Sequence, residues 1–114
     1  MKKSISALLI AAALIFSATT VFAASGSSLF SSEGCIACHA INGQGGSVGP
    51  DLSHVGSHRS LSWLKIQITH PSEHFAAGTT ANINGQSYQS IMPGHSNMPA
   101  SKLNALAAYL ESLK

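Results

Sequence analysis

The segment Cys35-Ile36-Ala37-Cys38-His39 decides how this 114-residue chain folds, and it holds both cysteines of the sequence. A Cys-x-x-Cys-His motif is spaced for attachment of a c-type haem, because each thiol can add to one of the two vinyl groups. The imidazole of His39 follows at once and can bind the iron. The motif therefore predicts one covalent haem c, held by thioether bonds from Cys35 and Cys38 and by His39 as an axial ligand.

Three other chemistries use closely spaced cysteines. A thioredoxin-like redox pair would require a preceding strand and a larger α/β domain, and the sequence predicts neither. A zinc site would need two more ligands at paired spacing, whereas the five other histidines are scattered along the chain. A disulfide across two residues would be strained and would leave His39 without a role. Haem attachment is therefore the preferred interpretation.

The second axial position of the iron has two candidate thioethers, Met92 and Met98. Met98 directly precedes a predicted helix, so it has little chain with which to reach a haem and is suited to pack on the first helical turn. Met92 is followed by a flexible segment that contains Gly94. We expect Met92 to be the ligand, with Met98, a histidine or an open position as the alternatives. The histidines concerned are His54, His58, His70, His74 and His95.

The N-terminal segment has the composition of a secretory signal peptide. Its first three residues include two lysines, an apolar stretch covers residues 5–16, and small residues surround Ala23. We expect residues 1–23 to be removed near Ala23 or Ala24, and residues 24–114 to form one domain in the periplasm. A retained membrane anchor is the alternative, because the apolar run approaches the roughly 20 residues that span a bilayer.

The charge of the exported part argues against several kinds of partner. The whole chain has six basic and four acidic side chains, and two of the lysines lie in the predicted signal peptide. The remainder is therefore close to neutral before a cofactor is added. It has no basic stripe for nucleic acid and no polybasic patch for lipid. We expect no nucleic-acid partner.

The remaining segments predict short helices and one hairpin. A helix should begin at the N-cap Ser60 and end before Pro71. Another should begin near Pro99 and run to the end of the chain. Residues 41–50 hold four glycines and a proline and are expected to form a loop. The apolar positions of the two helices are Leu61, Leu64 and Ile68 in the first, and Leu103, Leu106, Ala107, Leu110 and Leu113 in the second.

One further turn is expected between residues 79 and 91. Asn84-Gly85 lies there between Ile83 and Tyr88, and an Asn-Gly pair favours the tight turn of a β-hairpin. The sequence thus allows one small two-stranded ribbon before Met92.

With these residues in view, the mature chain resembles the class I cytochromes c, particularly small bacterial monohaem members. The resemblance rests on four features. These are Leu29-Phe30 ahead of the haem motif, Gly49-Pro50, Met92-Pro93, and Tyr109 in the last helix, 17 residues after Met92. It implies an all-α fold, with a few short helices wrapped around one covalent haem and a small hairpin near residues 80–90.

The resemblance also implies roles for single residues. The carbonyl of Pro50 would accept a hydrogen bond from Nδ1–H of His39 and so orient the imidazole. The spacing to the last helix supports Met92 as the axial ligand. Arg59 and Trp63 would donate to the haem propionates, although a surface role for Arg59 and a core role for Trp63 are the alternatives.

The resemblance further implies a crossing of the first and last helices. Gly26 and Phe30 of the first helix would pack against Leu106 and Tyr109 of the last. The chain departs from the simplest family pattern by the segment from Thr79 to Ile91, which is inserted before Met92.

The expected function is electron transfer by a monomer, through an exposed haem edge, between donor and acceptor redox proteins. Two filled axial positions leave no place for a small-molecule substrate, so we expect no enzymatic activity. One alternative is a haem-bearing subunit of a periplasmic or membrane-associated oxidoreductase. The other is an open-site haem sensor or peroxidase.

Overall fold

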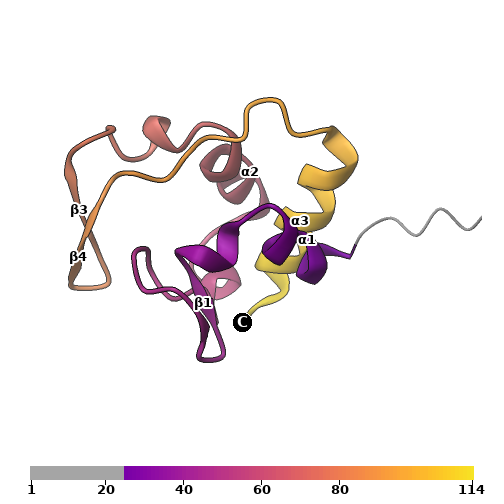
Figure 1. Cartoon of the computed structure of the whole chain (residues 1–114), viewed down its shortest axis with the longest axis horizontal. Coiled ribbons are helices and arrows are strands. Elements are labelled where there is room, and N and C mark those ends of the chain that lie inside the picture. The colour runs from indigo at the N-terminus through magenta and orange to yellow at the C-terminus, as the bar shows by residue number, and fades with distance from the viewer. Residues whose placement is uncertain (1–24) are drawn as a thin grey trace, which may run out of the picture.

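The computed structural model describes residues 25–114, and these form three α-helices, three 3₁₀ turns and two small antiparallel sheets (Figure 1). The α-helices are α1 (Gly26–Ser32), α2 (Leu61–Thr69) and α3 (Ala100–Ser112). The 3₁₀ turns are η1 (Cys35–Ala37), η2 (Val55–Ser57) and η3 (Pro71–Glu73). The predicted signal peptide, residues 1–23, lies outside the described residues. Within residues 25–114, every helix falls short of the length and apolar character needed to cross a bilayer.

Helices α1 and α3 cross where Gly26 lies against Tyr109. The side chain of Ser25 caps α1 by accepting a hydrogen bond from the backbone N–H of Ser28. A Cβ atom on Gly26 would overlap the carbonyl oxygen of Ala105 and Cβ of Tyr109. Only glycine lets the two backbones approach so closely. The predicted crossing of the first and last helices is therefore confirmed.

Helix α2 begins and ends where the sequence predicted. The hydroxyl of Ser60 accepts a hydrogen bond from the backbone N–H of Trp63 at 3.2 Å, and His70 follows the last helical residue. Leu64 and Ile68 are buried, whereas Leu61 is 40 % exposed. Two of the three apolar positions of this helix therefore belong to the core, whereas Leu61, its first residue, lies outside the packed cluster.

The core is built from all three α-helices, two or three side chains from each. Its members are Leu29, Phe30, Leu64, Ile68, Leu106, Ala107 and Leu110. Leu103 and Leu113 of the predicted C-terminal stripe are only partly buried and pack against this cluster. The last helix thus presents the apolar face that its spacing predicted.

Two β-hairpins are added to the helices, so the expectation of an all-α fold was incomplete. Strand β3 (Thr80–Ile83) pairs with β4 (Gln86–Gln89) around Asn84-Gly85. Both turn residues have positive φ, 52° and 78°, as a two-residue type I′ turn requires. This ribbon confirms the hairpin prediction and lies at the end of the molecule away from α1 and α3 (Figure 1).

The second hairpin was not predicted. Strand β1 (Ala40–Ile41) pairs with β2 (Gln44–Gly45), where a loop was expected. Its turn, Asn42-Gly43, has φ values of 50° and 80° and repeats the Asn-Gly chemistry of the first. Strands of two residues are too short to show the alternation of apolar and polar residues by which a strand is recognised.

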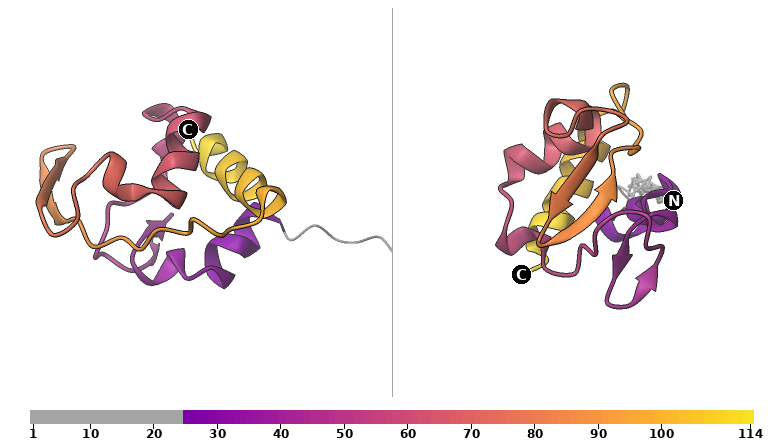
Figure 2. Two further views of the ribbon diagram at one scale, coloured as in Figure 1. Left: turned by 90° about the horizontal axis from the view of Figure 1, so that it is seen from above. Right: turned by 90° about the vertical axis from the view of Figure 1, so that its left-hand side faces the viewer.

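A strap, defined here as residues 91–98, connects β4 to α3 and passes over the C-terminal end of α2. The backbone N–H of His95 donates to the carbonyl oxygen of Ile68 at 2.9 Å. A Cβ on Gly94 would lie 2.7 Å from the carbonyl oxygen of Thr69, so a side chain there would push the strap outward. Figure 2 shows the strap running from the hairpin to the start of α3. These backbone contacts position Met92.

Candidate functional site

A cavity of about 940 Å³ lies between α2, the Cys-x-x-Cys-His segment, the strap and the β3–β4 hairpin. Its volume is in the range of cofactor sites, and most of its lining is apolar, including Leu52, Leu64 and Ile68. The lining brings together every residue that the sequence predicted for the site. These residues are Cys35, Cys38, His39, Pro50, Arg59, Trp63 and Met92.

The imidazole of His39 is oriented by a hydrogen bond to the backbone. Its Nδ1 lies 2.7 Å from the carbonyl oxygen of Pro50. A carbonyl can only accept, so Nδ1 carries the hydrogen and Nε2 keeps a lone pair for a metal. Burial lowers the pKa of His39, and the Pro50 carbonyl partly offsets this effect. The ring is therefore neutral near pH 7, which is the form that binds iron.

The loop around Gly49 presses its backbone against that imidazole. The N–H of Gly49 donates to the carbonyl oxygen of Cys38 at 2.8 Å. A Cβ at Gly49 would lie 2.5 Å from Cε1 of His39, well inside van der Waals contact. Only a glycine leaves room for the ring at this position.

Both cysteines lie at the wall of the cavity and are not joined by a disulfide. The turn η1 places them, with the backbone N–H groups of Cys38 and His39 both donating to the carbonyl oxygen of Cys35. Burial raises the pKa of the Cys35 thiol. Among residues 25–114, no three His, Cys, Asp or Glu side chains gather to hold a metal ion.

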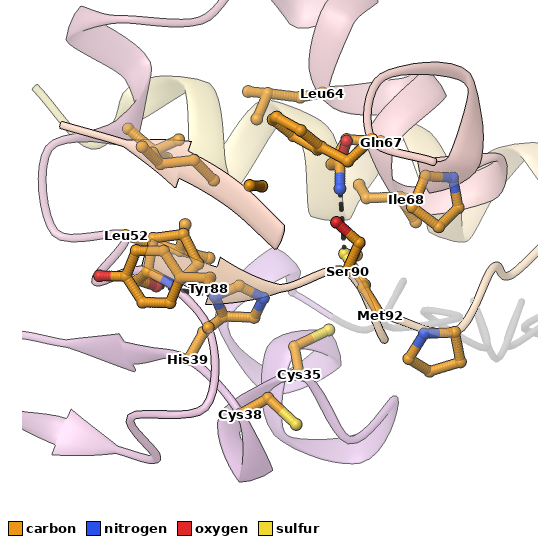
Figure 3. A pocket seen from close by; sticks show the side chains of 18 of the residues that line it. Cys35, Cys38, His39, Leu52, Leu64, Gln67, Ile68, Tyr88, Ser90 and Met92 are labelled. Atoms are coloured by element: carbon orange, nitrogen blue, oxygen red, sulfur yellow. Dashed lines mark hydrogen bonds between the residues drawn. The ribbon is translucent and has the colours of Figure 1, made fainter. Parts of the chain in front are cut away.

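Met92 lines this cavity and Met98 does not. Figure 3 shows Met92 approaching from one side, while Cys35, Cys38 and His39 project from the other. Met98 instead packs against the core and lines a separate depression beside Lys102. The strap thus brings one of the two candidate thioethers to the haem motif and directs the other onto the helices.

The alternative histidine ligands lie at the cavity edge or behind it. His54, His58 and His70 are exposed and His95 is partly buried, and all four contribute to the lining. Nδ1 of His54 lies 2.8 Å from the carbonyl oxygen of Lys114. His74 lies outside the lining and packs against Trp63.

Arg59 and Trp63 lie together at the cavity. Cζ of Arg59 is 4.2 Å from the centre of the Trp63 ring, within the range of a cation–π interaction. Both side chains carry N–H donors and line the cavity. They are therefore placed where a bound anionic group could accept hydrogen bonds from them.

Two polar residues of the site were missed at the sequence level. Nε2 of Gln67 lies 3.3 Å from Sδ of Met92. The hydroxyl of Ser90 also lines the cavity and is buried, with no hydrogen-bond partner among the described residues. The spacing of four residues between Trp63 and Gln67 on one helix could have indicated that both face the same side. Nothing in the sequence singled out Ser90.

The residues present fit a haem c. Two thiols, a neutral imidazole nitrogen and a thioether sulfur all face one apolar cavity of suitable volume. Thioether anchors with imidazole and thioether ligands are the donor set of a cytochrome c. The unpartnered Ser90 hydroxyl is a further sign that the cavity accepts a group with polar atoms.

Comparisons with known proteins found one family and one curated relative. The family model for cytochrome c matches residues 23–114. The chain is also 28 % identical over 96 residues to cytochrome c oxidase subunit 2 of Alkalihalophilus pseudofirmus, a match that covers 84 % of the chain. It spans only about a quarter of that relative's length, 27 %. No solved structure matches the chain. The family match covers all of the described residues and shows that the chain belongs to the cytochrome c family, in which covalently bound haem c transfers electrons.

Proposed function

We propose that this protein is a periplasmic carrier of single electrons, with one haem c attached through Cys35 and Cys38 and ligated by His39 and Met92. One observation supports the proposal: Met92 and the Cys-x-x-Cys-His motif line the same cavity, while Met98 packs elsewhere. The bound haem would supply reversible one-electron chemistry at its iron. Two protein ligands would leave no open position for a substrate.

The protein's own contribution is to orient the ligands and exclude water. Pro50 holds the imidazole of His39 in one tautomer and one direction. Leu64 and Ile68, both buried, form part of the apolar wall. Such a wall disfavours the more highly charged oxidised state, and a thioether ligand does the same, so we expect a higher reduction potential than with a second histidine.

Substitution of the two methionines tests the ligand assignment. In Met92→Ala, the long-wavelength absorption band of a ferric iron–thioether bond should disappear and the reduction potential should fall. Met98→Ala is the matched control, because it removes the same side chain from a site outside the cavity. It should keep the band. If the two variants gave the reverse result, the assignment of Met92 would be wrong.

Exposure to carbon monoxide tests whether the second axial position is filled. The reduced protein should show little spectral change at neutral pH, because Met92 would occupy the site. A rapid change in the unmodified protein would favour a sensor or peroxidase with an open iron. The Met92→Ala variant should react readily and serves as the positive control.

We further propose that partners dock transiently, and one at a time, where the cofactor edge reaches the surface. Val48 and Ile91 support this proposal, since both line the cavity and are 50 % and 63 % exposed. Electron carriers use small contacts that form and separate quickly. Such a surface would serve a monomer that shuttles between a donor and an acceptor.

A second candidate function is that of a haem-bearing subunit in a larger oxidoreductase. The similarity to cytochrome c oxidase subunit 2 is the observation that favours it. Gentle extraction of native membranes, followed by size analysis of the tagged protein, separates the two. A carrier should be recovered as a monomer from the periplasmic fraction, whereas a subunit should co-migrate with a large complex.

A further inference from the structure

A continuous series of contacts leads from Trp63 to the sulfur of Met92. Trp63 and Gln67 lie four residues apart on α2 and so share one face of the helix. The ring of His74 is stacked on that of Trp63, with centroids 4.2 Å apart and planes within 2°. Nδ1 of His74 lies 2.9 Å from Oε1 of Gln67, and Nε2 of Gln67 lies 3.3 Å from Sδ of Met92.

The chemistry of these groups sets the direction of each hydrogen bond. A thioether sulfur can only accept, so the NH₂ group of Gln67 must face Met92. The amide oxygen of Gln67 then faces His74, and Nδ1 of that histidine must carry the hydrogen. The amide of Gln67 is thus held at both ends and has one orientation (Figure 3 shows the contact with Met92).

His74 is itself held in place by its surroundings. Its backbone N–H donates to the carbonyl oxygen of Pro71 at 3.1 Å, which closes the turn η3. Phe75 forms a T-shaped pair with the Trp63 ring, with centroids 6.3 Å apart and planes at 74°. Arg59 covers the same indole at 4.2 Å. The donor to Gln67 therefore belongs to a packed cluster and not to a mobile surface side chain.

We propose that Gln67, oriented by His74, is a positioning residue that weakens the donor strength of the Met92 sulfur and so raises the reduction potential. The inference rests on the proposed ligation by Met92. A hydrogen bond to the sulfur draws electron density away from the lone pairs that a metal would share. The oxidised state depends more on that density than the reduced state, so the bond favours reduction.

Met92 is held in the cavity by the strap and not by its hydrogen bond from Gln67. The strap is fixed by the His95 N–H on the Ile68 carbonyl and by the close approach of Gly94 to Thr69. Removal of the Gln67 amide should therefore leave Met92 in place and change only the electronic character of its sulfur.

The first test is Gln67→Leu, which keeps the approximate size of the side chain and removes its amide. At the midpoint potential of the unmodified protein, the ratio of reduced to oxidised variant should shift about two- to tenfold toward the oxidised form, the range for one hydrogen bond. The iron–thioether band should remain. Gln86→Leu is the matched control, because Gln86 is exposed on β4 and does not line the cavity. It should leave the potential unchanged.

The second test is His74→Phe, which can keep the stack on Trp63 but removes the donor to Gln67. The potential should fall in the same direction as in Gln67→Leu, and by less, since the amide remains but loses its fixed orientation. The double variant should fall no further than Gln67→Leu alone, because the two residues act through one contact. If Gln67→Leu does not fold, the single variant His74→Phe still tests the proposal.

Three results would overturn the proposal. An unchanged potential in Gln67→Leu would show that the amide does not influence the sulfur. Loss of the iron–thioether band in that variant would show that the amide holds the ligand and does not tune it. Additive effects of Gln67→Leu and His74→Phe would show that the two residues act separately. Absence of the band in the unmodified protein would instead refute ligation by Met92, and the present inference with it.

Discussion

At the scale of single residues, the imidazole of His39 is the most constrained group of the site. Pro50 accepts its Nδ1 hydrogen at 2.7 Å, and the backbone of Gly49 lies against the ring. One neighbour sets the tautomer and the other restricts the ring position. Both constraints come from the same dipeptide, Gly49-Pro50, which is recognisable in the sequence.

Gly49→Ala tests this constraint. The added Cβ would lie 2.5 Å from Cε1 and 2.9 Å from Nδ1 of His39, so the ring must shift or the loop must move. We expect a loss of stability of about 1–3 kcal/mol, as for an overpacked site. A change in reduction potential should accompany it. Urea denaturation and redox titration measure the two effects.

Gly78→Ala is the comparison for Gly49→Ala. Gly78 has a φ of 78° and no atom within 4 Å of an added Cβ, so alanine there strains the backbone without touching the site. It should lower the free energy of unfolding by about 1–2 kcal/mol and leave the potential unaltered. An equal shift of potential in both variants would contradict the role assigned to Gly49.

At the scale of elements, close contact between helices outweighs helix propensity. Alanine is favoured over glycine inside a helix by about 1 kcal/mol, so propensity alone would disfavour Gly26 in the seven-residue helix α1. The crossing with α3 reverses this preference, since any Cβ at Gly26 would meet the backbone of Ala105. A backbone atom cannot move aside as the end of a flexible side chain can.

We therefore expect Gly26→Ala to destabilise the protein despite its gain in propensity. The net loss should be about 1–3 kcal/mol, as for other insertions into packed contacts, read as a lower urea midpoint. Ser27→Ala is the control, because Ser27 is an exposed neighbour on α1, and its effect should stay within about 0.5 kcal/mol. A more stable Gly26→Ala protein would show that α1 and α3 do not approach as described.

At the scale of the whole molecule, the charges of the described residues nearly cancel. Four basic and four acidic side chains lie beyond residue 24. Lys102 pairs with Glu33 at 3.4 Å, and Lys114 pairs with Glu111. The side chains of both pairs are partly exposed to solvent, so the pairs contribute little to stability. Because these opposite charges are paired, the surface of the described residues has no strong electrostatic field.

A balanced surface predicts a weak dependence of electron-transfer rates on salt. Steered association changes by factors of ten or more with ionic strength. For this protein we expect the electron-transfer rate to change by less than about threefold between low and high salt. This should hold both for ferricyanide and for a cationic cobalt complex, with the rates measured by stopped-flow absorbance. Lys65→Glu is the positive control and should slow the reaction with ferricyanide at low salt. A steep fall in the rate of the unmodified protein would contradict the prediction.

Much of the site could be predicted from the sequence because its chemistry is local. The Cys-x-x-Cys-His motif specifies haem attachment through three residues within five positions. The cap at Ser60 and the turn at Asn84-Gly85 depend on neighbouring backbone groups, and both are present as predicted. The β1–β2 hairpin escaped prediction, since strands of two residues leave no periodicity to detect.

By itself, then, the sequence determined the cofactor class and predicted the cysteine anchors and His39, because covalent spacing and local turns depend on adjacent residues. Only the tertiary structure decided which methionine lines the cavity, and that Gln67 and His74 stand behind it. Gln67 and Met92 are 25 residues apart in the chain, and no local rule connects them. They meet because the strap is fixed to the end of α2 by backbone hydrogen bonds, which are contacts that only the folded chain can form.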